Sequence, residues 1–189
     1  LNVNSSELNQ VPFGWEELNG IHNRTNYDLS RHQEYSGKSM LYTDPISGEK
    51  FIPYIIEFSV GADRLFLTLI ANAYTEEQLD NGETRVVLKI LPRLAPIKVA
   101  VLPLQKNLSE KATEVFNTLR QKFNCDYDES GSIGKRYRRH DEIGTPLCVT
   151  VDFDSLEDNT VTVRDRDTMK QERIKIDDLV SYINDKIFG

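Results

Sequence analysis

A chain of 189 residues with 39% hydrophobic and 28% charged residues has an ordinary globular composition, and it is long enough for one large domain or two small ones. Its formal net charge is −7, of which residues 1–94 carry −5 and residues 95–189 carry −2. This balance argues against a protein that binds nucleic acid through an overall positive charge. Binding through a local basic patch remains possible. No stretch approaches about 18 consecutive apolar residues and no basic-then-apolar leader opens the sequence, so we expect a cytoplasmic protein without a membrane span.

The first part of the chain mixes strand and helix patterns with polar connections. Leu65, Leu69 and Ala73 recur at the four-residue spacing of a helix, directly after an apolar strand that ends in glycine. The predicted elements are, in chain order, a strand at 14–21, a turn at Ser47–Gly48, a strand at 55–58, a helix from Gly61 and a solvated surface connection at 76–84.

A domain boundary is predicted where prolines interrupt an apolar run. Pro92, Pro96 and Pro103 punctuate "LPRLAPIKVAVLPL", and the first two disfavour helix in the residues before them. The run between Pro96 and Pro103 is typical of a buried strand. We therefore expect one domain over 1–94 and a second over 95–189.

The second part has the element order of an α/β domain. Ala112, Val115, Phe116, Leu119 and Phe123 form an apolar helical face, with Ser109 as the expected N-cap. The predicted elements are a strand at 97–102, this helix at 108–123, a strand at 125–127, a basic helical segment within 130–146, strands at 145–153, 160–166 and 170–176, and a helix at 176–188. This order predicts a layered α/β fold of ordinary domain size.

The two cysteines of the chain carry no sign of special chemistry. Cys125 and Cys148 are isolated, with neither CxxC spacing nor a cluster of histidines. We interpret them as small buried hydrophobic residues, and no metal site is predicted.

Several long motifs, in order, resemble one known family. "PFGWEELNGIHNRTNYDL", "YIIEFSVGADRLFLTLI", "LAPIKVAVLPL" and "DESGSIGKRYRRHDEIGTPLCVTVDFDSLEDNTVTVRDRDTM" are similar to the carboxy-terminal half of the archaeal/eukaryotic-type class II glycyl-tRNA synthetases. "GADR" with the following apolar helix resembles class II motif 3, whereas motifs 1 and 2 have no counterpart in the sequence. The resemblance implies a partial antiparallel-sheet catalytic domain, followed by a three-layer anticodon-binding domain with a mixed sheet.

The resemblance also implies a glycine and ATP site in the first part. Glu57, Ser59 and Glu17 would bind glycine, and Arg64 would face ATP; strand alternation puts Glu57 and Ser59 on one face. Arg24 and Asp28 would orient the site or form a structural ion pair. Taken without the family, Glu57 is typical of a solvated strand carboxylate and Arg64 of an ordinary first-turn residue.

A dense basic stretch in an acidic chain suggests contact with tRNA. Phosphates are bound by Arg and Lys, and splayed loop bases are bound by stacking and by hydrogen bonds to their edges. We expect phosphate contacts from Arg136 and Arg139 and base contacts from Glu142 and Arg164. The full predicted set is Lys135, Arg136, Arg138, Arg139, Glu142 and Arg164. The alternative is a solvated helix paired internally to Asp141 and Glu142, with Arg164 and Arg166 paired to Asp165 and Asp167.

Together these features imply one part of an enzyme of protein biosynthesis. The family activates glycine with ATP and Mg²⁺ and transfers it to glycine tRNA, so we expect a homodimer when full length and no tightly bound cofactor on this piece. Because motifs 1 and 2 are absent, we expect residues 1–189 alone to be inactive. The alternative from another class is a non-catalytic synthetase-like accessory subunit that binds nucleic acid, such as the processivity factor of the mitochondrial DNA polymerase.

Overall fold

The computed structural model describes residues 4–11 and 14–189, and it divides into two compact units. The amino-terminal unit is Leu1–Ala71 and the carboxy-terminal unit is Asn72–Gly189. The contact boundary therefore falls before the predicted one at residues 94 and 95, because the segment after Asn72 packs with the later part of the chain. Within the described part of the chain, no helix has the length and apolar character that crossing a bilayer requires.

The amino-terminal unit is built on an antiparallel sheet of order β1-β2-β5. Its elements are β1 (Asn4–Val11), β2 (Gly14–Thr25), α1 (Tyr27–Ser36), the short pair β3 (Tyr42–Thr43) and β4 (Lys50–Phe51), β5 (Ile55–Val60) and α2 (Ala62–Ala73). The strands predicted at 14–21 and 55–58 and the helix predicted from Gly61 are confirmed. The turn before β4 contains Gly48, whose φ of 71° is a left-handed conformation that favours glycine.

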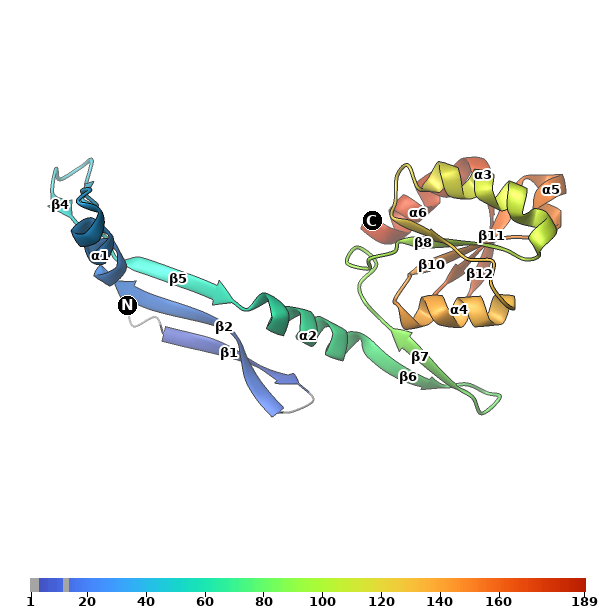
Figure 1. Ribbon diagram of the computed structural model, residues 1–189, viewed down its shortest axis with the longest axis horizontal. Helices are drawn as coiled ribbons and strands as arrows, with labels where there is room; N and C mark the ends of the chain where they lie inside the picture. Colours follow the sequence, from blue (N-terminus) through green and yellow to red (C-terminus); the bar gives the residue numbers. More distant parts are fainter. Residues whose placement is uncertain (1–3, 12–13) are drawn as a thin grey trace. The chain divides into compact units, whose positions relative to one another are not determined.

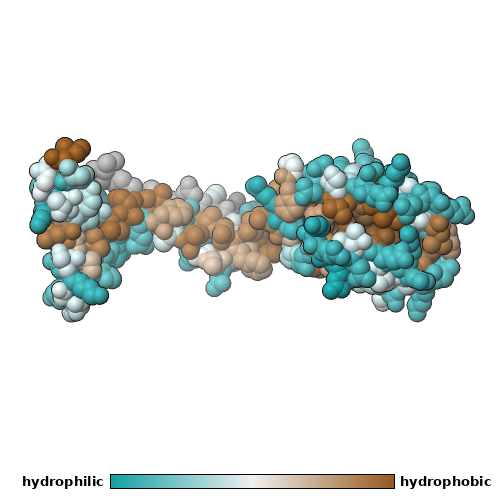
Figure 2. Space-filling model, turned by 90° about the horizontal axis from the view of Figure 1, so that it is seen from above, coloured by the Kyte–Doolittle hydropathy of each residue, from teal (hydrophilic) through white to brown (hydrophobic). Residues whose placement is uncertain are grey.

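Apolar side chains of β5 and α2 remain exposed in the amino-terminal unit. Figure 2 shows brown, hydrophobic surface over this stretch. The exposed residues include Ile56, Phe58, Val60, Leu65, Phe66 and Leu69. Of the stripe that the sequence predicts on α2, Leu65 and Leu69 are thus exposed, whereas Ala73 at the end of the helix is buried.

The carboxy-terminal unit contains a five-stranded mixed sheet of order β12-β11-β10-β8-β9 (Figure 1). The strands are β8 (Val99–Pro103), β9 (Cys125–Tyr127), β10 (Leu147–Val151), β11 (Thr160–Asp165) and β12 (Gln171–Lys175). β8 runs parallel to both β9 and β10, whereas β11 is antiparallel to β10 and β12. The central strands β8 and β10 are buried along their whole length, as expected for strands with both faces covered.

Helices cover both faces of this sheet and complete three layers. α3 (Ser109–Leu119) and α6 (Leu179–Phe188) pack their apolar residues into the main core, while α4 (Ile133–Glu142) covers the other face (Figure 1). The predicted element order is confirmed, with a short additional helix, α5 (Asp154–Asp158), and 3-10 turns before α3 and α6. The predicted N-cap is wrong: Ser109 is already helical, and its hydroxyl donates to Glu129 Oε2 at 2.9 Å.

A polar hairpin precedes the sheet in the carboxy-terminal unit. β6 (Tyr74–Gln78) pairs antiparallel with β7 (Thr84–Leu88), so the solvated surface connection predicted at 76–84 is an exposed hairpin end whose two strands the prediction missed. The reason is ionic: Glu77 lies 2.7 Å from Arg85 Nη1 and 2.7 Å from Lys89 Nζ. A segment that reads as solvated from its composition is held as a strand by charges from its partner strand and from the residue that follows it.

The cysteines behave as the sequence suggests. Cys148 is buried in the sheet beside Ala100 and Leu102, and this burial raises the pKa of its thiol to about 12. Cys125 is half-buried, and desolvation raises the pKa of its thiol to about 11. Neither thiol is therefore ionised near neutral pH, which disfavours a nucleophilic role.

Candidate functional site

The basic stretch of the sequence is the helix α4, and the helix sorts its four cations by depth. Lys135 and Arg139 are exposed, Arg138 is half-buried and Arg136 is buried. Ile133, Arg136, Tyr137 and His140 follow the helical repeat that faces the sheet. Four neighbouring charges in the sequence therefore occupy different environments in the structure.

Arg136 is engaged inside the fold. Its Nη1 donates to the carbonyl of Pro103 at 2.5 Å and to that of Asp128 at 3.2 Å, and only 3% of the residue is exposed. The guanidinium thus caps the end of β8. This burial conflicts with the predicted phosphate contact, because phosphate would have to reach a group that the sheet and helix already cover.

Arg139 is exposed but ion-paired. It binds the Asp128 carboxylate through two nitrogens and donates to the Ser130 carbonyl at 2.6 Å. Burial alone would raise the pKa of Asp128, but the N–H of Ser130 and the guanidinium of Arg139 lower it below its usual value. The partner is Asp128, in the segment before the helix, and not the Asp141 or Glu142 of the alternative interpretation.

The remaining cations line a pocket of about 420 Å³ in the carboxy-terminal unit. Arg164, from β11, stacks over the Tyr137 ring with 4.8 Å between its guanidinium carbon and the ring centre. The Tyr137 hydroxyl is fixed in turn by Thr150 Oγ1 at 2.7 Å. The lining residues are Glu83, Ser132, Gly134, Lys135, Tyr137, Arg138, Arg164 and Met169. Side chains that are far apart in the sequence thus combine three cations with an aromatic ring.

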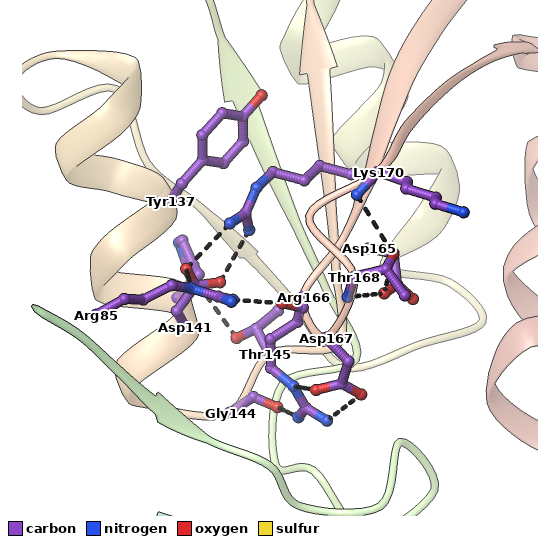
Figure 3. A network of polar contacts seen from close by, with 12 residues as sticks. Arg85, Tyr137, Asp141, Gly144, Thr145, Asp165, Arg166, Asp167, Thr168 and Lys170 are labelled. Carbon is purple, nitrogen blue, oxygen red and sulfur yellow. Dashed lines mark hydrogen bonds and ion pairs between the residues drawn. The ribbon is translucent and has the colours of Figure 1, made fainter. Parts of the chain in front are cut away.

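A buried ionic network lies behind this pocket (Figure 3). Asp141 accepts from both terminal nitrogens of Arg164, at 2.8 and 3.1 Å, and from Arg85 Nε at 2.8 Å. Arg85 also donates to the carbonyl of Arg166. Asp141 is therefore shared by two almost fully buried guanidiniums, so this buried carboxylate is both ion-paired and hydrogen-bonded.

Arg85 and Arg166 tie the hairpin and its following loop to the rest of the unit. Desolvation opposes the charge of Arg85, yet Asp141 and Glu77 outweigh it and raise the pKa of the guanidinium. Arg166 donates to the carbonyls of Gly144 and Ile90 and pairs with Asp167 at 2.8 Å. The predicted alternative is right for Arg166 with Asp167, whereas Arg164 pairs with Asp141 and not with Asp165.

The predicted tRNA contacts are only partly brought together. Lys135, Arg138 and Arg164 line the pocket, whereas Arg136 and Arg139 are bonded elsewhere. Glu142 is exposed at the end of α4 and is not among the lining residues. The base-contact prediction for Glu142 has no support from this placement.

The amino-terminal unit brings part of the second predicted site together. Arg24 binds both carboxylate oxygens of Asp28 at 2.9 Å and lies 3.3 Å from Glu57 Oε2. In the β2–β5 register Glu57 faces His22 and Ser59 faces Gly20. Glu57 and Ser59 thus share one sheet face, as alternation predicts, and the first of them already has a cationic partner.

Arg64 and Glu17 also meet, but through the main chain. Arg64 Nη1 donates to the Glu17 carbonyl at 2.7 Å, so the contact does not use the Glu17 carboxylate. The same sheet face carries a close approach: a Cβ at Gly20 would lie 2.3 Å from Nε2 of His22. A side chain at Gly20 would therefore require the imidazole of His22 to move.

Other functional residues were missed for want of a local signal. Arg85 is a single charge beside two valines, and Asp141, which the sequence suggested only as a partner within its own helix, pairs with Arg85 and Arg164 from two strands. Glu83 stands in a polar turn that has the composition of an ordinary hairpin end. Among the described residues, no three His, Cys, Asp or Glu side chains converge as a metal ion would require.

Sequence and fold both match known proteins. Residues 98–186 match the anticodon binding domain family. The chain is 60% identical over 176 residues to "Glycine--tRNA ligase" of Clostridium kluyveri and of Caldanaerobacter subterraneus subsp. tengcongensis, covering 93% of this chain and 38% of each relative. The protein of that name from Clostridium acetobutylicum is 58% identical over 178 residues, again with 38% of its length covered.

The fold is also that of a solved RNA-binding domain. The structure matches that of the RNA binding domain of threonyl-tRNA synthetase from Cryptosporidium parvum Iowa II with a TM-score of 0.71 and 18% identity, covering 98% of this chain and 43% of the other. The chain spans less than two fifths of the curated relatives that it matches. It is homologous to part of these ligases, and its carboxy-terminal unit contains an anticodon-binding domain.

Proposed function

We propose that the chain is the carboxy-terminal part of a glycine--tRNA ligase and that its carboxy-terminal unit binds the anticodon loop of glycine tRNA. The observation that carries this proposal is the pocket in which Lys135, Arg138 and Arg164 meet Tyr137. The identity of 60% to glycine--tRNA ligases supports the choice of tRNA.

The pocket supplies both kinds of contact that a single-stranded loop needs. Lys135 and Arg138 are placed to neutralise phosphates, and the Arg164 guanidinium, stacked on Tyr137, offers a flat cationic surface to a base. Asp141 uses one N–H on each terminal nitrogen of Arg164, and a guanidinium has five such donors. Arg164 is only 5% exposed, so a base would contact it only through the part that lines the pocket.

An anticodon swap tests this function. We expect the chain to bind a glycine tRNA more tightly than the same tRNA with its anticodon replaced, and the Lys135→Ala/Arg138→Ala variant to weaken both. The matched control is Arg120→Ala/Lys122→Ala, which removes an exposed Arg and Lys near the end of α3. Equal binding of both tRNAs by the native chain, with no effect of the first variant, would refute the proposal.

The glycine and ATP contacts of the amino-terminal unit belong to the same proposal. Glu57, Ser59 and Glu17 would bind glycine and Arg64 would bind ATP with its Mg²⁺ in the full-length, homodimeric, cytoplasmic enzyme. Support comes from the shared sheet face of Glu57 and Ser59 and from the position of Arg64 in the first turn of α2. The archaeal/eukaryotic-type subclass is a further part of the proposal, which rests on the motifs in the sequence.

A test of activity separates the part from the whole. Because motif 2 supplies charged contacts to the triphosphate in this family and is absent from the sequence, we expect no glycine-dependent pyrophosphate exchange from residues 1–189, but clear exchange from the full-length protein. Turnover by the purified chain would contradict the first expectation.

One observation favours a second candidate, a nucleic-acid-binding accessory protein without catalysis. Arg24 already forms ion pairs with Asp28 and Glu57, which is also the arrangement expected of a purely structural ion cluster. Absence of exchange in the full-length protein, together with intact RNA or DNA binding, would decide for this candidate.

A further inference from the structure

The hairpin β6–β7 lies outside residues 98–186, the part that matches the anticodon binding domain family. It is nevertheless bound firmly to α4 and β11. Arg85 of β7 is fully buried and donates to the Asp141 carboxylate and to the Arg166 carbonyl. Figure 3 shows these groups converging between the hairpin and the helix. The hairpin is thus held in place within the carboxy-terminal unit by these contacts.

The tip of this hairpin reaches the pocket. Glu83, directly before β7, is among the lining residues and is the only carboxylate in that set, all of whose members lie in the described part of the chain. Arg138 Nη2 lies 3.9 Å from its carboxylate, and 69% of the Glu83 side chain is exposed. So long and exposed an ion pair contributes little to stability, so the fold itself does not account for an acid at this place.

The chemistry of the pocket points to a ligand with a hydrogen-bond donor. A site that bound only phosphate would gain nothing from a carboxylate, because like charges repel. A nucleobase with an exocyclic amino group is different: carboxylates accept from the N4 amino group of cytosine. The three cations can bind the phosphates, and the one carboxylate can accept a hydrogen bond from the edge of a base.

We propose that Glu83 is a specificity-determining residue of this pocket, where its carboxylate accepts a hydrogen bond from the amino group of an anticodon cytosine. This inference rests on the proposed binding of glycine tRNA, whose anticodons end in two cytosines. It replaces Glu142, which the sequence suggested for this role and which lies outside the pocket lining. A segment before the matched domain thereby contributes to its selectivity.

The experiment compares the anticodon stem-loop RNA of a glycine tRNA with two variants, in each of which one of the two cytosines is replaced by uracil. Uracil carries an acceptor where cytosine carries the amino group, so the native chain should prefer cytosine at one position. In Glu83→Gln that preference should fall by about fivefold or more, because the amide of Gln both donates and accepts. Asp80→Asn, an exposed acid-to-amide change in the same hairpin end, should leave the preference intact.

The outcomes separate this inference from the function on which it rests. If the native chain binds no stem-loop or shows no preference, the proposed function fails. If the native chain prefers cytosine and Glu83→Gln keeps the whole preference at unchanged melting temperature, only the role of Glu83 is overturned. If Asp80→Asn reduces the preference as much as Glu83→Gln, the effect is one of net charge and the inference is wrong.

Discussion

The two units use arginine in opposite ways. In the carboxy-terminal unit Arg85, Arg136 and Arg166 are exposed by 0%, 3% and 2% and bind groups distant in the sequence. In the amino-terminal unit the side chains of Arg24 and Arg31 are 43% and 49% exposed and pair with acids three or four residues away, and Arg24 additionally lies 3.3 Å from Glu57. Arginine side chains therefore form buried contacts within the fold of the carboxy-terminal unit, whereas in the amino-terminal unit they lie at the surface.

This contrast changes how the basic stretch is interpreted. Its formal charge suggests four cations available to RNA. However, Arg136 is already hydrogen-bonded to backbone carbonyls and Arg139 is already ion-paired with Asp128. Lys135 and Arg138 remain at the pocket, where Arg164 of β11, itself paired with Asp141, also lies. The cations available to RNA are thus the ones that the fold has not already paired with carboxylates or carbonyl groups.

The largest effect should come from removing the shared acid of the buried network. Asp141→Asn leaves Arg85 and Arg164 without their common anion, and breaking a buried pair in this way costs about 3–5 kcal/mol. We expect this loss in urea unfolding, with faster hydrogen exchange in β8 and β10. Asp28→Asn, which removes the exposed partner of Arg24, should change stability little; equal losses in both variants would erase the contrast between the units.

The second prediction concerns the exposed cluster of the amino-terminal unit. If Glu57 binds the ammonium group of glycine, Glu57→Gln in the full-length enzyme should raise the glycine KM by about tenfold or more, since hydrogen bonds to charged groups contribute about 1.5–3 kcal/mol. The ATP KM should hardly change. Unchanged kinetics for glycine would identify Glu57 as a partner of Arg24 only.

The third prediction distinguishes the cations of α4 that are free to bind phosphate from those already bonded within the fold. Lys135→Ala should lower the dependence of tRNA affinity on salt, with the slope of log K against log[salt] falling by about 0.7–0.9. Arg136→Met should leave that slope unchanged while it destabilises the unit, because its guanidinium is buried against Pro103. A change of slope in Arg136→Met, with native stability, would restore the phosphate role that the sequence suggested.

The sequence predicts what local patterns determine and misses what long-range pairing determines. The strands at 99–103, 125–127 and 147–151 follow from β-branched and apolar runs between turn residues. The buried face of α4 could also be predicted from the sequence, because Ile133, Arg136 and His140 follow the helical repeat. The pairing of Arg85 with Asp141 joins residues 56 positions apart, and no local pattern encodes it.

The smallest predicted effect comes from the single histidine of the carboxy-terminal unit. His140 is 2% exposed, and its Nδ1 lies 3.2 Å from Thr145 Oγ1. Desolvation lowers the pKa of its imidazole below 6.5, although Asp126, Asp128 and Asp141 act in the opposite direction and Arg139 acts with it. The folded state therefore stays neutral at a pH where the unfolded state already binds a proton.

The sign of the pH dependence follows from this difference. As pH falls below about 6.5 the unfolded state takes up the proton first, so the free energy of unfolding should fall, by at most about 1.4 kcal/mol per pH unit, until the folded imidazole also titrates. The lowered pKa values of Asp128 and Asp152 act at more acidic pH, which leaves the window from about pH 7 to 5 to histidine. Urea unfolding of the native chain and of His140→Gln across this window tests it: the variant should lose the part of the slope that His140 contributes. A slope that persists unchanged in the variant would mean that the buried imidazole of His140 does not carry the pH dependence.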